Sequence, residues 1–184
     1  MKKVLVGALL FACAFSTVAQ DSSEYVFTPI KELKVTPVKN QNRTGTCWSF
    51  SGQGFLEAEL LRQGKGEFDL SEMFVVSHSY KDKADKFVRL HGKLNFGQGG
   101  SFEDVLYVMK HYGAVPEAAM SGLQYGEDMH VHGEMEAIAS SYVNAVVKND
   151  NGKLSTSWKK GYDGVIDSYL GAIPEKFMYN GKEY

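Results

Sequence analysis

The chain has 184 residues, of which 43% are hydrophobic and 23% are charged. This balance excludes a disordered chain and predicts one domain with a hydrophobic core. The formal net charge is −2. The first nineteen residues carry Lys2 and Lys3 and no acid, so without them 18 basic side chains stand against 22 acidic ones and the net charge is −4. This charge does not favour nucleic acid as a partner.

The N-terminus has the pattern of a secretory signal. Lys2 and Lys3 form its basic start, an apolar run covers residues 4–15, and small residues lead to Ala19. We expect cleavage after Ala19, which makes residues 1–19 the signal and places the mature protein in the periplasm or outside the cell. The apolar run is shorter than the roughly 20 residues that span a bilayer, so we expect no stable membrane span.

Cysteine usage depends on how this signal is processed. The alternative to simple export is a lipoprotein signal with Cys13 as the lipidated residue, although Phe11 is bulky for that motif. Simple export removes Cys13, leaves Cys47 as the only thiol and makes an intrachain disulfide impossible. A single thiol in an exported protein is either buried and inert or kept for its chemistry.

The apolar spacing predicts a helical chain after an extended, proline-containing lead-in over residues 21–40. Helical periods and end signals predict helices over about 47–63, 71–90, 101–113, 135–146 and 157–170. Residues 117–133 show no strong period, and residues 178–184 are expected to end in polar turns without a closing element.

Three details of these helices are specific enough to test. Gly52 and Gly54 predict close packing of the first helix against another element. The alternating charges of residues 81–86 predict a stretch that faces solvent. The apolar period of the first helix predicts the following buried face: Trp48, Ser51, Phe55, Ala58 and Leu61.

Cys47 lies where the first helix is expected to begin. A thiol with an ordinary pKa of about 8.5 needs help to ionise at neutral pH, and a helix N-terminus provides positive potential. The backbone N–H of Cys47 and the side-chain amide of Gln41 could bind the oxyanion that forms when a thiolate attacks a carbonyl. Gly45 lets the backbone approach a substrate closely. The alternative is that Cys47 is a small buried hydrophobe and Gln41 a loop residue.

The segment around this thiol resembles the active site of papain-like cysteine peptidases. The resemblance is carried by the sequence PVKNQ at residues 37–41 and by CWSFS at residues 47–51. It implies an α+β papain-like fold in which Cys47 is the nucleophile, Gln41 supplies the oxyanion hole and Trp48 packs beneath.

Thr44 occupies the position where plant papains carry a second cysteine, and this departure favours the bleomycin hydrolase and aminopeptidase C branch. Residues 70–72, 99–102 and 110–116 are similar to that branch. The resemblance implies peptide substrates, no cofactor, an aminopeptidase-like activity and a ring-like homohexamer. It also implies that Gly45, Trp48, Gly99 and Gly100 contact substrate, the glycine pair through its backbone, although a plain loop is the alternative for that pair.

A general base is missing from the pattern. None of the five histidines has the setting of the family's catalytic histidine, which lies far downstream in a second domain and is oriented by an asparagine. We therefore expect residues 20–184 to be the helical half of the fold, truncated before its β-rich half, with the histidine and asparagine beyond Tyr184. The alternative is a non-catalytic binding module or a pseudoenzyme. The histidines are His78, His91, His111, His130 and His132.

Two of these histidines also allow a metal hypothesis. His130 and His132 are spaced to share one face of a strand, and Glu127, Asp128 and Glu134 lie nearby. The signal is weak, because a surface loop with two titrating histidines has the same sequence. We expect no metal site.

Overall fold

The computed structural model describes residues 25–150 and 152–184, so the predicted signal and Cys13 lie outside the described residues. The chain divides into two units, Met1–Glu32 and Leu33–Tyr184. The described part of the first unit is exposed and forms no helix or strand. Within the described ranges, no helix is both long enough and apolar enough to cross a membrane.

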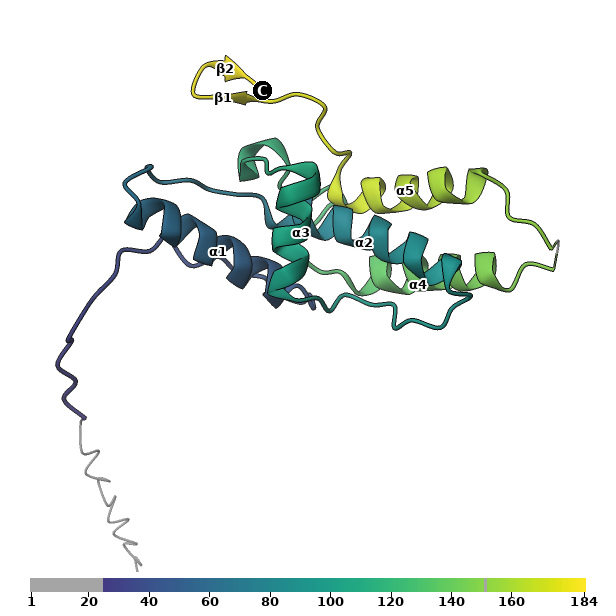
Figure 1. Cartoon of the computed structure of the whole chain (residues 1–184), viewed down its shortest axis with the longest axis horizontal. Coiled ribbons are helices and arrows are strands. Elements are labelled where there is room, and N and C mark those ends of the chain that lie inside the picture. The colour runs from purple at the N-terminus through teal and green to yellow at the C-terminus, as the bar shows by residue number, and fades with distance from the viewer. Residues whose placement is uncertain (1–24, 151) are drawn as a thin grey trace, which may run out of the picture. The chain divides into compact units, whose positions relative to one another are not determined.

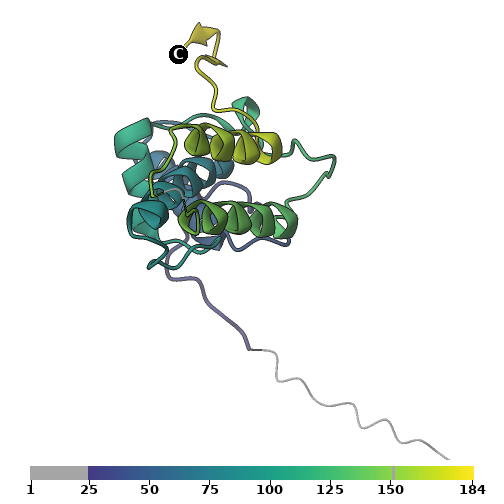
Figure 2. The same cartoon turned by 90° about the vertical axis from the view of Figure 1, so that its right-hand side faces the viewer.

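Helices dominate the second unit, and α2 is the element around which the others pack. This helix contacts α1, α3, α4 and α5, and α4 also packs directly on α5, as Figures 1 and 2 show. All five predicted helices are confirmed. Their bounds are α1 Cys47–Arg62, α2 Glu72–Arg89, α3 Phe102–Tyr112, α4 Gly133–Val147 and α5 Ser157–Leu170.

Local capping chemistry sets two of the helix starts. The Ser71 hydroxyl accepts a hydrogen bond of 3.0 Å from the Phe74 N–H at the start of α2. At the start of α3, the Asp104 carboxylate accepts a hydrogen bond of 2.8 Å from the Ser101 N–H. Because these contacts span only three residues, the sequence alone predicts where both helices begin.

Two segments predicted to be irregular contain short elements. A 3₁₀ turn, η1, covers Glu117–Ala119. The C-terminal segment forms a hairpin of β1, Met178–Tyr179, and β2, Lys182–Glu183, which pair antiparallel. The turn uses left-handed backbone at Asn180 (φ 50°) and Gly181 (φ 76°), the conformations that favour Asn-Gly in a two-residue hairpin. The expectation that no closing element exists here is therefore wrong.

The buried face of α1 is polar, which contradicts the predicted apolar face beyond Trp48. Phe55 is 58% exposed, whereas Gln53 and Glu57 are almost fully buried. Burial of these groups is possible because each meets the N-terminal end of α2 or the residues before it. The hydrogen bonds run from Ser49 Oγ to Glu72 O (2.9 Å), from Gln53 Nε2 to Ser71 O (3.1 Å) and from Leu70 N–H to Glu57 Oε1 (2.7 Å).

The two glycines inside α1 differ. A Cβ at Gly52 would lie 2.6 Å from Val105 Cγ2 of α3, so close packing at Gly52 is confirmed. A Cβ at Gly54 would meet no atom within 4 Å, so the same prediction is wrong there.

The charged stretch over residues 81–86 does not simply face solvent, as its alternating charge had predicted. Lys81 Nζ lies 2.6 Å from Asp167 Oδ1 of α5, and its side chain is only 16% exposed. Lys83 and Asp85 are partly buried, and Ala84 is fully buried. The alternating charges thus join α2 to its neighbours.

A lysine-centred cluster joins the segment before α1 to α1 and α2. Lys39 Nζ lies 2.7 Å from Asp69, 2.9 Å from Glu72 and 3.2 Å from Glu57. Burial opposes the Lys39 charge, but hydrogen bonds to Asp69 and Glu72 outweigh it and raise the pKa of Lys39. The chain therefore keeps one ammonium as the shared partner of two buried carboxylates.

Glu117 lies beside this cluster and gives a pH-dependent prediction. Burial, followed by the charge of Glu72, raises the pKa of Glu117 to about 8, and Glu117 Oε2 has no hydrogen-bond partner among the described residues. The pKa of Glu117 in the folded protein exceeds its ordinary value of 4.5, so the fold favours the neutral carboxyl group. The stabilisation that comes from this preference is complete below pH 4.5 and is lost as pH rises through 8. We expect Glu117→Gln to raise the free energy of unfolding by about 2 kcal/mol at pH 9 and to leave it unchanged at pH 4.

Urea unfolding at the two pH values checks this prediction. An equal effect of Glu117→Gln at pH 4 and pH 9 would contradict it, because only an ionisation produces a difference between them. Glu175→Gln is the matched control on an exposed carboxylate.

Candidate active site

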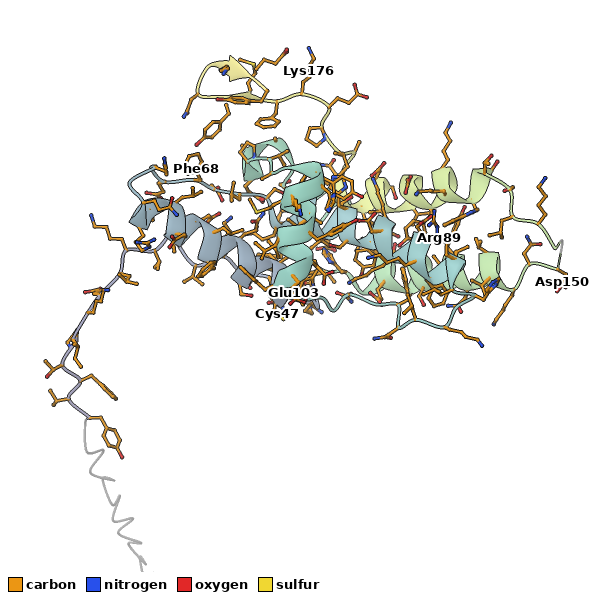
Figure 3. All side chains as sticks on the ribbon, in the orientation of Figure 1. Cys47, Phe68, Arg89, Glu103, Asp150 and Lys176 are labelled. Atoms are coloured by element: carbon orange, nitrogen blue, oxygen red, sulfur yellow. The ribbon has the colours of Figure 1, made fainter. Side chains whose placement is uncertain are left out.

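The Cys47 side chain lies at the first residue of α1 and is exposed, so the alternative of a small buried hydrophobe is wrong. Figure 3 shows the labelled thiol at the end of α1 that lies beside the start of α3. Thr46, the N-cap residue before it, is fully buried, and its carbonyl accepts hydrogen bonds from the N–H groups of Ser49 (2.9 Å) and Phe50 (3.3 Å). Among the described residues, no acceptor binds the backbone N–H of Cys47. This N–H is therefore available to an oxyanion formed next to the sulfur.

Gln41 lies in a loop that is closed by its own side chains. Gln41 Nε2 donates to Thr44 O (2.8 Å), and the Thr44 hydroxyl donates back to Gln41 O (3.1 Å). The hydroxyls of Thr44 and Thr46 are 2.6 Å apart. An amide nitrogen carries two hydrogens, so Gln41 can make this bond and still offer a second donor.

Residues 97–100 lie directly against the thiol-bearing segment. Gln98 Oε1 accepts a hydrogen bond of 2.7 Å from the Gly45 N–H, and Gln98 O accepts one of 2.9 Å from the Trp48 indole. A Cβ at Gly100 would lie 2.5 Å from Trp48 Cε2, so only glycine fits against the ring in this geometry. The structure thus places Gln98 and Gly100 against Gly45 and Trp48. That Gly45, Trp48, Gly99 and Gly100 contact substrate stays a prediction.

Two residues at this contact were not predicted. The first is Gln98, and the second is Lys83 of α2, whose Nζ contacts the carbonyls of Gly97 and Gly99. Gln98 is adjacent to a glycine pair and could have been suspected from that position. Lys83 carries no local signal, because it lies within a charged helical stretch.

The two histidines of the metal hypothesis lie in a segment that pairs with the residues after Gln41. Val131 forms a parallel bridge with Arg43, closed by Arg43 N–H to His130 O (3.1 Å) and His132 N–H to Arg43 O (3.2 Å). The imidazole rings of His130 and His132 lie 5.8 Å apart. In the described part of the chain, no three His, Cys, Asp or Glu side chains are grouped so that they could hold a metal ion.

His132 is fully buried, so the alternative of a surface loop with two titrating histidines is wrong for His132, whereas residues 126–129 are exposed. Neither of its ring nitrogens has a partner among the described residues, and the rings of His130 and Tyr125 face it. Burial, and secondarily His130, lowers the pKa of His132 to about 4. The imidazole is therefore neutral at neutral pH.

The stability of the second unit should consequently depend on pH. The pKa of His132 in the folded protein, about 4, is below its ordinary value of 6.5. Between pH 6.5 and pH 4 the unfolded chain therefore binds a proton at His132 that the folded chain does not bind. Burial also lowers the pKa of His78 to about 4, so His78 contributes to the same pH dependence. We expect His132→Met to reduce, by about 3 kcal/mol, the decrease in the free energy of unfolding that occurs as pH falls from 6.5 to 4, and to leave the contribution of His78.

Urea unfolding followed by tryptophan fluorescence measures that dependence. The exposed His111 gives the matched control, His111→Met, which should retain the wild-type decrease. A decrease of equal size in His132→Met would contradict the assignment to His132.

The sequence profile described as "Papain family cysteine protease" matches residues 22–164. This match covers most of the chain, so the chain belongs to the papain family of cysteine proteases. The fold agrees with that assignment, since it aligns with the crystal structure of PepW from Lactobacillus rhamnosis HN001 with a TM-score of 0.56. The alignment has 18% sequence identity and covers 83% of this chain and 41% of that chain. The expected papain-like fold, here mainly helical, is confirmed.

Curated relatives match in part. Cysteine proteinase 1, mitochondrial, of Saccharomyces cerevisiae is 27% identical over 123 residues, which are 58% of this chain and 26% of that protein. Human cathepsin L2 is 47% identical over 49 residues, which are 27% of this chain and 15% of that protein. The chain therefore spans about a quarter or less of the length of these relatives.

Proposed function

We propose that this protein is a cysteine peptidase that hydrolyses peptide bonds through Cys47. The observation that carries the proposal is the exposed thiol at the first residue of α1, beside its own unengaged N–H. The Gln41 amide, which bonds to Thr44 O three residues before Cys47, is the proposed second donor. Membership of the papain family supports the same chemistry.

In the proposed reaction, the Cys47 thiolate attacks the carbonyl carbon of a peptide. The oxyanion receives hydrogen bonds from the Cys47 N–H and from the second hydrogen of Gln41 Nε2. The C–N bond then breaks, the amine leaves with a proton from a general acid, and an acyl thioester remains on Cys47. Water hydrolyses the thioester and restores the thiol.

We propose that the general base of this reaction lies in a part of the protein beyond Tyr184. In the described part of the chain, no histidine is hydrogen-bonded to the Cys47 thiol, and the imidazole of His132 is fully buried. The short span of this chain relative to its relatives supports a second half that supplies a histidine and an orienting asparagine. Residues 20–184 alone are then inactive.

The finer assignment is to the bleomycin hydrolase and aminopeptidase C branch, with release of amino acids or short peptides. The residues quoted above at 70–72, 99–102 and 110–116 support it, as does Thr44 in place of a cysteine. By the same resemblance, we propose a homo-oligomer, of which a hexamer is the expected form. The N-terminal sequence supports export, with a mature chain that starts at Gln20.

Labelling of the full-length protein with a thiol-directed epoxide peptide tests the proposed function. We expect the label on Cys47 by peptide mass mapping, and loss of peptide hydrolysis in Cys47→Ser. Substrates with free and with blocked N-termini separate aminopeptidase from endopeptidase activity. No label on Cys47, together with equal hydrolysis by Cys47→Ser, would exclude the enzyme and favour a non-catalytic binding protein.

A further inference from the structure

The segment over residues 97–100 needs an external support. Three of its four residues are glycine, and the segment forms no helix or strand. Glycine loses more conformational freedom on folding than any other residue, so such a segment does not hold one conformation by itself. Its position against Trp48 and Gly45 must therefore come from contacts with other elements.

Lys83 provides one such support from α2. Its ammonium donates hydrogen bonds to Gly97 O (3.4 Å) and to Gly99 O, the two carbonyls that flank Gln98. The same nitrogen lies 5.4 Å from the centroid of the Trp48 ring, within the range of a cation–π interaction. One side chain thus contacts both the glycine segment and the indole that follows Cys47.

The charge of Lys83 is not used in an ion pair. Among the described residues, no carboxylate oxygen lies within 4 Å of its ammonium, whereas Lys81 and Lys39 each have at least one such partner. Asp104 and Glu136 act on it only at longer range, and burial lowers its pKa. The hydrogen-bonding capacity of this ammonium is directed at backbone carbonyls, which is the arrangement expected of a residue that fixes a loop.

Gln98 completes the support from within the segment. Its side chain accepts from the Gly45 N–H and its carbonyl accepts from the Trp48 indole, so it bonds to both residues that flank the Thr46–Cys47 pair. A Cβ at Gly45 would lie 2.8 Å from Gln98 Cβ, which shows how closely the two segments approach. These contacts link residues 97–100 to the nucleophile without a covalent bond.

We propose that Lys83 and Gln98 are positioning residues that hold the Gly99–Gly100 backbone at a fixed distance from Cys47, where an extended peptide substrate would pair with it. The assignment to substrate binding rests on the proposed peptidase function. The two residues act on substrate through the glycine segment and Trp48. Their loss should raise KM more than it lowers kcat, because the segment binds substrate and does not perform the bond cleavage.

The test uses Lys83→Met in the full-length protein, which keeps much of the side-chain length and removes the ammonium. We expect about a tenfold rise in KM for an extended peptide with kcat nearly unchanged, the size of effect that follows from losing a charged hydrogen bond. Lys83→Arg should restore part of the loss. Lys86→Met is the matched control, since Lys86 lies one turn further along α2 and is exposed.

Hydrogen exchange gives a readout that does not depend on activity. The Gly45 amide is bonded to the Gln98 side chain, so we expect it to exchange about tenfold faster in Lys83→Met and in Gln98→Ala, with the α2 amides unchanged. Gln98→Ala keeps Lys83 intact and therefore serves if Lys83→Met does not fold.

The outcomes separate the two proposals. Faster exchange at Gly45 in a protein that hydrolyses no peptide would support the positioning role and overturn the proposed function. Unchanged exchange in both variants, as in Lys86→Met, would overturn the positioning role whatever the activity. Faster exchange with an unchanged KM would overturn its part in substrate binding.

Discussion

Gln41→Ala should lower kcat of the full-length protein by about 10²–10³, the usual effect of removing one oxyanion-hole donor. The physical reason is that the oxyanion would keep the Cys47 N–H and lose the amide hydrogen that Gln41 Nε2 retains beyond its bond to Thr44 O. KM should change little, because the negative charge on the oxygen develops only in the transition state. Steady-state kinetics with a peptide substrate measures both quantities.

Gln63→Ala is the matched control for this prediction. Gln63 has the same side chain, lies just after the opposite end of α1 and is exposed, and its amide donates to the Glu59 carboxylate. Gln41→Glu should be at least as damaging as Gln41→Ala, because a carboxylate accepts hydrogen bonds and cannot donate them. A kcat within twofold of wild type in Gln41→Ala would show that this amide is not an oxyanion donor.

Lys39→Met should destabilise the second unit by about 3–5 kcal/mol, the cost of removing one partner from a buried ion pair. Glu57 and Glu72 have side-chain exposures of 1% and 4%, so both carboxylates would remain in the interior without their ammonium. Asp69 is 67% exposed, and Asp69→Asn should cost less than about 1 kcal/mol because solvent screens that pair. Urea unfolding of the three proteins gives the comparison.

A double variant sharpens the stability prediction. Lys39→Met combined with Glu72→Gln removes the cation and one buried charge together, so it should be more stable than Lys39→Met alone. Equal stability of wild type and Lys39→Met would contradict the assigned role of Lys39. The expected loss of stability also means that activity assays on Lys39 variants would report unfolding rather than catalysis.

The helices and their starts were readable from the sequence because the responsible contacts are local. Ser71 and Asp104 each bond to a backbone group three residues away, and the Asn180–Gly181 turn is specified by two adjacent residues. The hairpin was nevertheless missed, because its strands are only two residues long and show no alternating pattern.

The α1 face was predicted wrongly for the opposite reason. Periodicity assigns apolar residues to the interior, yet Phe55 is exposed while Gln53 and Glu57 are buried. These polar groups can be buried only because the start of α2 and the residues before it offer matching donors and acceptors. A pattern of residue types along one helix contains no information about such partners.

By itself, the sequence determined the helical order, the thiol at a helix start and the segment that carries the resemblance to papain-like peptidases. Only the tertiary structure decided that Lys83 and Gln98 support the glycine segment and that His132 is buried. The reason is physical: Gln98 contacts the nucleophile loop across 53 and 50 residues of sequence, and such pairings depend on how whole helices pack. Local propensity predicts elements, whereas the partners of a buried polar group are set by the fold.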